Sequence, residues 1–194
     1  MSLRSLLEQR PIVVALAGPN GAGKSTFFDG FLADTGLYFV NADVLALSLG
    51  MGAYAAQELA DKLRRRLVER RESFIFETVF SDPVGDKIEF LKQAEKAGYT
   101  VFMIFIGIAS PAISNDRVAM RASTGGHDIP NQKLIERFPR TMKNLKAALV
   151  ELDNVWVFDH SDLDAGYRIV ATKEDGGRVI VHRPSPKWLR ALLP

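Results

Sequence analysis

The chain has 194 residues, of which 47% are hydrophobic, so it can bury a full core, and we expect one domain over 1–194. Its 25 basic and 23 acidic side chains give a net charge of +2, which indicates neither a nucleic acid nor a membrane as a partner. There is no cysteine, which excludes disulfides, thiolate zinc sites and cysteine nucleophiles and fits a cytoplasmic protein. The longest apolar stretch is about half a membrane span, so we expect no transmembrane helix and no signal peptide.

Short apolar runs rich in β-branched and aromatic residues predict five buried parallel strands. The runs are Ile12 to Ala17, Tyr38 to Val40, Phe74 to Phe76, Val101 to Ile108 and Val155 to Phe158. Segments with helical spacing lie between them, at Lys24 to Leu32, Ala53 to Arg71, Val84 to Ala97, Pro111 to Arg121 and Gln132 to Leu149. Pro139 predicts a kink or a break in the last of these helices. This alternation predicts an α/β fold with a doubly wound, mainly parallel five-stranded sheet and helices on both faces.

Two further β-type segments follow the fifth run and predict a C-terminal β-hairpin over about 166–183. Tyr167 to Ala171 and Arg178 to His182 flank Glu174-Asp175-Gly176-Gly177, which is typical of a tight turn. The sequence leaves open whether this hairpin extends the sheet, covers a substrate site or pairs two chains.

A phosphate-binding loop (P-loop) follows the first predicted strand. Gly18-Pro19-Asn20-Gly21-Ala22-Gly23-Lys24-Ser25 fits the pattern G-x-x-x-x-G-K-S, between a strand and a helix as the motif requires, and Thr26 completes the nucleotide-binding set. The glycines let backbone N–H groups curl around phosphate oxygens at the positive end of the following helix. We expect Lys24 to bridge the β- and γ-phosphates of ATP or GTP, and the Ser25 hydroxyl to hold Mg²⁺. The sequence therefore predicts a P-loop NTPase.

Other classes of P-loop protein find less support along the chain. GPNGAGKST is common in ABC transporter ATPases, but the chain has neither their LSGGQ signature nor a strand that ends in Asp-Glu, and it has no NKxD motif of GTPases. A regulatory or nucleic-acid-associated NTPase remains an alternative. The basic run 62–71 is interleaved with acidic residues, which favours a solvated helix face over an RNA-binding surface. Small-molecule kinases fit best.

Acidic residues follow the second and third predicted strands, at the sheet edge where open α/β sheets bind ligands. Asp43 is the candidate catalytic base, which would accept the proton of a substrate hydroxyl and direct its oxygen to the γ-phosphorus. An aspartate there equally suits the N-cap of a helix. Glu77 and Thr78 are expected beside Mg²⁺ or the acceptor; Glu77 would reach the metal or bind the substrate. A purely structural cap on the turn 81–83 is the alternative for this pair.

An arginine-bearing lid is predicted over about 110–130. Arg117 and Arg121 are four residues apart on one helix face, and the polar, glycine-rich loop that follows contains His127. Arginines brought over the nucleotide would neutralise charge on the transferring phosphoryl group. His127 and Arg137 are candidate contacts to the substrate; a solvated surface position is the alternative for each.

In these motifs the chain resembles the zeta toxin family of P-loop kinases, over roughly Ile12 to Ser161. The resemblance is carried by GPNGAGKST, Asn41-Ala42-Asp43, Phe76-Glu77-Thr78-Val79-Phe80-Ser81, Arg117-Val118 through Arg121, Gly125 to Pro130, and Arg137 with Asn144-Leu145. It implies an ATP- and Mg²⁺-dependent kinase acting on UDP-N-acetylglucosamine, with Asp43 as the catalytic base and Lys24 as the phosphate lysine. It also implies an antitoxin as a protein partner. A kinase that inactivates an antibiotic shares the same base and lid and stays open as an alternative.

Overall fold

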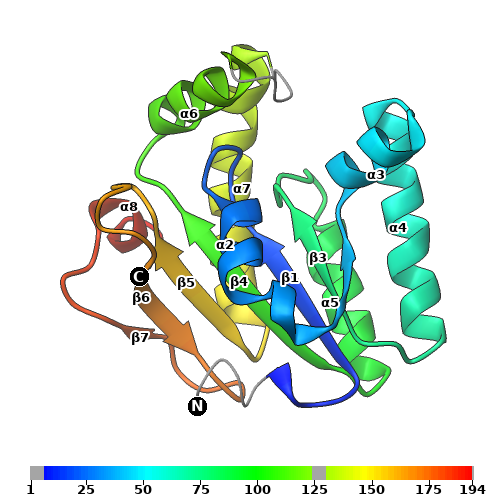
Figure 1. Cartoon of the computed structure of the whole chain (residues 1–194). Coiled ribbons are helices and arrows are strands. Elements are labelled where there is room, and N and C mark those ends of the chain that lie inside the picture. The colour runs from blue at the N-terminus through cyan, green and yellow to red at the C-terminus, as the bar shows by residue number, and fades with distance from the viewer. Residues whose placement is uncertain (1–6, 124–129, 194) are drawn as a thin grey trace.

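In a computed structural model, which describes residues 7–123 and 130–193 and the side chains of 7–120 and 130–193, seven strands form one sheet (Figure 1). The order across the sheet is β2-β3-β1-β4-β5-β6-β7. The strands are β1 (Ile12–Ala17), β2 (Tyr38–Val40), β3 (Phe74–Thr78), β4 (Thr100–Gly107), β5 (Val155–Asp159), β6 (Arg168–Lys173) and β7 (Ile180–Val181).

The first five strands pair in parallel, which confirms the predicted α/β fold. In the register of the central strand, Ala17 lies opposite Thr78 of β3 on one side and Phe105 of β4 on the other. β6 pairs antiparallel to β5, and β7 pairs antiparallel to β6. Of the three possibilities for the C-terminal hairpin, the structure shows the first, because the hairpin extends the sheet.

Helices cover both faces of the sheet (Figure 1). They are α2 (Lys24–Phe31), the short 3-10 helix η1 (Ala33–Thr35), α3 (Ala42–Leu49), α4 (Ala53–Glu69), α5 (Asp86–Lys96), α6 (Pro111–Ser123), α7 (Asn131–Glu151) and α8 (Lys187–Arg190). α2 packs on one face, and α4, α5, α7 and α8 pack on the other. Within the described ranges, no helix is both long and apolar enough to cross a membrane.

The core has two halves, one on each face of the sheet. Val13 of β1 belongs to the cluster that contains Leu145 of α7, and its neighbour Val14 belongs to the cluster that contains Phe27 of α2. Successive side chains of a strand point to opposite faces. Because both faces are covered, every residue of β1 is fully buried, which explains its uninterrupted apolar sequence.

Two helical features differ from the sequence-based expectations. α3 was not predicted, and it begins directly after Asn41, whose side-chain oxygen accepts hydrogen bonds from the N–H groups of Asp43 and Val44. α7 is assigned as one helix through Pro139, so this proline does not split it. Pro139 has no N–H to donate to the main-chain oxygen of Ile135. One residue further along, the Arg140 side chain donates from Nε to the main-chain oxygen of Glu136.

Candidate active site

The P-loop has a backbone that only glycine adopts easily. Gly18, Gly21 and Gly23 have φ angles of 145°, 70° and 92°, all in the range that L side chains rarely adopt. A Cβ atom on Gly18 would also lie 2.2 Å from the main-chain oxygen of Ile106 on β4. The loop therefore packs directly against the neighbouring strand, and α2 begins at Lys24 with its first turn facing the loop.

Glu77, near the end of β3, joins three residues around the loop. Its Oε2 atom accepts hydrogen bonds from Ser25 Oγ at 3.1 Å and from Asn41 Nδ2 at 2.9 Å. Its Oε1 atom lies 3.6 Å from Lys24 Nζ, which also donates to the main-chain oxygen of Pro19. The side chains of Lys24 and Glu77 are only 6% and 13% exposed, so water screens this ion pair little. The structure thus brings together three residues that the sequence assigned to phosphate and metal binding.

The oxygen atoms of this cluster fit a magnesium ion. The described residues contain no group of three or more His, Cys, Asp or Glu side chains that could hold a metal. Mg²⁺ usually binds to one or two protein oxygens and completes its shell with water and substrate phosphates. The Ser25 hydroxyl and the Glu77 carboxylate supply hard oxygen donors of this kind, 3.1 Å apart.

Asp43 lies in the first turn of α3, on the same side of the sheet edge as the cluster. Asn41 fixes this turn, because its Oδ1 caps the helix while its Nδ2 donates to Glu77. The N-cap is therefore Asn41 and not Asp43, whose side chain is exposed. One asparagine thus ties the position of the candidate base to that of Glu77.

A polar cavity of about 360 Å³ opens where β3 ends. It is lined by Gln57, Thr78, Val79, Phe80, Ser81, Asp82, Lys87, Arg137 and Arg140. Three of these side chains are cationic. Burial and the nearby Arg64 lower the pKa of Lys87 to about 8, although Asp82 and Asp86 act in the opposite direction. The cavity suits an anionic group better than an apolar one.

Thr78 and Arg137, the two described residues of this cavity that the sequence predicted to contact a substrate, both line it. The Thr78 hydroxyl also accepts a hydrogen bond from the N–H of Phe80 at 3.0 Å, and Phe80 has a φ angle of 60°. Thr78 therefore stabilises the backbone directly after β3 at Phe80, which is not the turn 81–83 named in its structural alternative. Lys87 and Arg140 also line the cavity, and the sequence did not single out Lys87, because it lies within a predicted helix among other charged residues.

The predicted lid residues are only partly described. Arg117 of α6 is half-buried and donates to the main-chain oxygens of Gly21, His160 and Ser161, at 3.4, 2.8 and 3.0 Å. Burial lowers the pKa of Arg117. Its guanidinium holds the P-loop to the end of β5, in contrast to the expected contact with a transferring phosphoryl group. The side chain of Arg121 and the whole of His127 lie outside the described residues.

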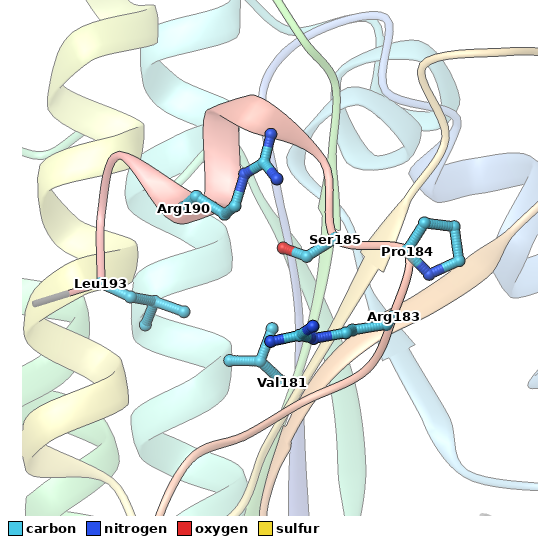
Figure 2. A pocket seen from close by; sticks show the side chains of 6 residues that line it. All are labelled: Val181, Arg183, Pro184, Ser185, Arg190 and Leu193. Atoms are coloured by element: carbon cyan, nitrogen blue, oxygen red, sulfur yellow. The ribbon is translucent and has the colours of Figure 1, made fainter.

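A second cavity, of about 570 Å³, lies away from the predicted site residues (Figure 2). It is formed at the far edge of the sheet by β7, the segment 183–185 and the C-terminal helix. None of the residues predicted for nucleotide, metal or substrate binding lines it. The cavity at the end of β3, which Thr78 and Arg137 line, is therefore the better candidate for an acceptor.

Solved structures with a similar architecture include the following two. The AvrRxo1-ORF1:-ORF2 complex with ATP matches with a TM-score of 0.71 and 19% identity, over 92% of this chain and 63% of that one. The PezAT toxin-antitoxin system of Streptococcus pneumoniae matches with a TM-score of 0.60 and 17% identity, over 85% of this chain and 75% of that one. The chain thus spans less than two thirds of the AvrRxo1 chain. At these identities the similarity establishes the fold.

Comparisons of the amino-acid sequence with known proteins identify the family. No curated protein matches the chain. The family model for zeta toxin matches residues 52–171, which is more than half of the chain and includes Glu77, Arg117 and Arg137. This match shows that the chain belongs to the zeta toxin family.

Proposed function

We propose that the protein is an ATP- and Mg²⁺-dependent kinase that transfers the γ-phosphate to a hydroxyl of a small molecule. The observation that carries the proposal is the contact of Glu77 with Ser25, Lys24 and Asn41 at the carboxyl ends of β1 and β3. This is where open α/β sheets bind ligands. The P-loop supplies the phosphate-binding half of the site, and Asn41 links it to the candidate base.

Each residue has a role that follows from its chemistry. Lys24 places a positive charge at the β- and γ-phosphates, and the backbone N–H groups of the loop bind their oxygens. Ser25 and Glu77 hold Mg²⁺, which neutralises charge on the phosphates when bound. Asp43 accepts the proton of the acceptor hydroxyl and orients its oxygen for in-line transfer.

The acceptor in this proposal carries a negative charge. Lys87, Arg137 and Arg140 line the cavity at the end of β3, and arginine pairs well with phosphate and carboxylate groups. UDP-N-acetylglucosamine, the acceptor implied by the family, has a diphosphate and is the first substrate to test. The cavity also contains Asp82, which suits a hydrogen-bond donor such as a sugar hydroxyl.

The test is a transfer assay with ATP, Mg²⁺ and UDP-N-acetylglucosamine, followed by ³¹P NMR. We expect a new phosphomonoester signal with the wild-type protein and none with Asp43→Asn, which should still bind ATP in calorimetry. Transfer of phosphate to a different alcohol, such as an antibiotic, would support the kinase activity but show that UDP-N-acetylglucosamine is not the acceptor. ATP or GTP hydrolysis that RNA, DNA or a protein stimulates, with no phosphorylated acceptor, would establish the regulatory NTPase instead.

We extend the proposal to a protein partner. The PezAT structure is described as a toxin-antitoxin system, and this chain shares its fold. Under the proposal, expression of the chain inhibits growth, the Asp43→Asn variant does not, and a cognate antitoxin restores growth. Equal growth inhibition by both variants would separate toxicity from phosphoryl transfer.

A further inference from the structure

The main-chain oxygens of the P-loop are held from outside by side chains of α6. Ser114 Oγ donates to the oxygen of Asn20 at 2.6 Å, and Arg117 donates to the oxygen of Gly21 at 3.4 Å. Ser114 is 2% exposed, so its hydroxyl is committed to this contact. These two contacts reach the first half of the loop.

Residues around β5 and β6 hold the next two oxygens. His160 Nδ1 lies 2.8 Å from the oxygen of Ala22, and the Tyr167 hydroxyl donates to the oxygen of Gly23 at 2.6 Å. A carbonyl oxygen only accepts hydrogen bonds, so the contact to Ala22 requires a proton on Nδ1 of His160. Four consecutive main-chain oxygens, from Asn20 to Gly23, therefore each have a side-chain donor.

The rings of His160 and Tyr167 pack tightly against the loop. They stack on each other with centroids 4.0 Å apart and an angle of 20° between them. A Cβ atom on Gly23 would lie 2.8 Å from two ring atoms of His160 and 2.8 Å from the Tyr167 hydroxyl. His160 is buried, and burial raises the pKa of Tyr167, although the Thr26 side chain and Arg117 lower it. The Tyr167 hydroxyl therefore stays protonated at neutral pH and can donate to the loop.

The C=O and N–H of a peptide unit point in opposite directions. The N–H of Ala22 donates to the oxygen of Pro19 within the loop. The donors that hold the oxygens of Ala22 and Gly23 orient the N–H groups of Gly23 and Lys24 to the opposite side, where a phosphate-binding nest needs them. We infer that His160 and Tyr167 are positioning residues that hold the P-loop in its phosphate-binding conformation. This inference rests on the proposed function, because it assumes that the loop binds a nucleotide polyphosphate.

A purely structural role is the competing explanation, and the chain offers a matched control for it. Tyr99 is 5% exposed, and its hydroxyl donates to the main-chain oxygens of Leu67, Val68 and Glu72. Tyr99→Phe and Tyr167→Phe each remove one hydroxyl that donates to main-chain oxygens, in part-buried surroundings. Only the second of these hydroxyls contacts the P-loop.

The experiment measures ATP and ADP affinity by calorimetry and thermal stability by scanning calorimetry for both variants. We expect Tyr167→Phe to weaken ATP and ADP binding by about tenfold, because the loop loses one hydrogen bond that orients it, while the Gly23 oxygen keeps only its hydrogen bond from the N–H of Phe27. Tyr99→Phe should lower Tm about as much as Tyr167→Phe does, but it should leave the affinities for ATP and ADP unchanged. Equal nucleotide affinities in wild type, Tyr99→Phe and Tyr167→Phe would overturn the inference.

His160 gives a second, independent test. His160→Asn retains a donor near the position of Nδ1, whereas His160→Ala removes it. We expect Asn to restore most of the ATP affinity that Ala loses; equal losses in the two variants would contradict a role for the Nδ1 proton. If the wild-type protein itself binds neither ATP nor ADP, the proposed function fails, and that outcome is distinct from wild-type binding that the variants leave unchanged.

Discussion

The Ser25 hydroxyl donates a hydrogen bond to Glu77 Oε2 across 3.1 Å, and so joins the start of α2 to the end of β3. The other carboxylate oxygen of Glu77 lies 3.6 Å from Lys24 Nζ. One acidic residue thus contacts both P-loop side chains that the proposal assigns to phosphate and metal binding. We therefore expect removal of the negative charge of Glu77 to slow phosphoryl transfer strongly.

We predict that Glu77→Gln lowers kcat by about 100-fold or more, because it removes both a metal-binding oxygen with full charge and the partner of Lys24. The Mg²⁺ concentration needed for half-maximal rate should rise in the same variant. Steady-state kinetics at several Mg²⁺ concentrations measure both effects. Glu58→Gln is the control, because Glu58 is an exposed carboxylate of α4 that pairs with Lys62. Unchanged kinetics in Glu77→Gln would remove Glu77 from the site.

A second prediction concerns the cations at the end of β3. Arg137→Ala and Arg140→Ala should each raise the KM for UDP-N-acetylglucosamine by about tenfold or more and leave the affinity for ATP unchanged, because an arginine lost from an anion contact costs that much. Initial rates at varied acceptor and calorimetry with ATP measure the two quantities. Arg66→Ala, which changes an exposed arginine of α4 paired with Glu69, should alter neither. A KM that stays constant in both cavity variants would place the acceptor elsewhere.

The sequence predicted the parts of the candidate site that are built from residues close together in the chain. The P-loop follows from a contiguous motif, and the register of β1 with β3 then brings Glu77 to the loop. The contacts that surround the loop were beyond such reasoning. Ser114, His160 and Tyr167 are 94, 138 and 144 residues from the oxygens that they bind, and no local pattern encodes these pairings.

The fold was predicted where burial shapes the sequence and missed where it does not. Strands covered on both faces show apolar runs, which is how β1, β3, β4 and β5 were found. The edge strand β2 was found from a run of three residues although Tyr38 is exposed. α3 has no such signal, because it carries an apolar sequence yet is not packed as a core helix. Leu47, for example, is 86% exposed. The N-terminus of α3 is fixed by the Asn41 cap. The sequence had offered Asp43, not Asn41, as a possible helix N-cap.

We predict that the segment after β3 depends on two polar residues of α7. Asn144 Nδ2 donates to the main-chain oxygens of Phe80 and Asp82, at 3.0 and 2.9 Å, and Thr141 Oγ1 donates to that of Val79 at 2.9 Å. Asn144→Ala should lower the free energy of unfolding by about 2 kcal/mol, because buried acceptors lose their donor. Urea denaturation measures the loss. Gln132→Ala, at an exposed amide of the same helix, should change it by less than about 0.5 kcal/mol.

A last prediction concerns Glu95 of α5, where charge opposes folding at neutral pH. Burial and the charge of Asp153 raise the pKa of Glu95 above its usual 4.5, although Lys92 and Lys173 act in the opposite direction. Its Oε1 atom is buried, with no hydrogen-bond partner among the described residues. The Glu95 carboxyl group therefore binds its proton more tightly in the folded protein than in the unfolded chain. This favours folding below the unfolded pKa, and the advantage is lost as the pH rises through the folded pKa.

Glu95→Gln should consequently be more stable than the wild type at pH 7, because the amide is neutral at every pH, and the difference should shrink toward zero near pH 4. Urea unfolding at pH 4, 5.5 and 7 measures the free-energy difference between the two proteins. Glu89→Gln is the matched control, since Glu89 is an exposed carboxylate of the same helix that accepts from Gln93. A Glu95→Gln protein that is less stable than the wild type at pH 7 would show that the carboxylate is stabilised by its surroundings, and a difference independent of pH would show that its titration contributes nothing.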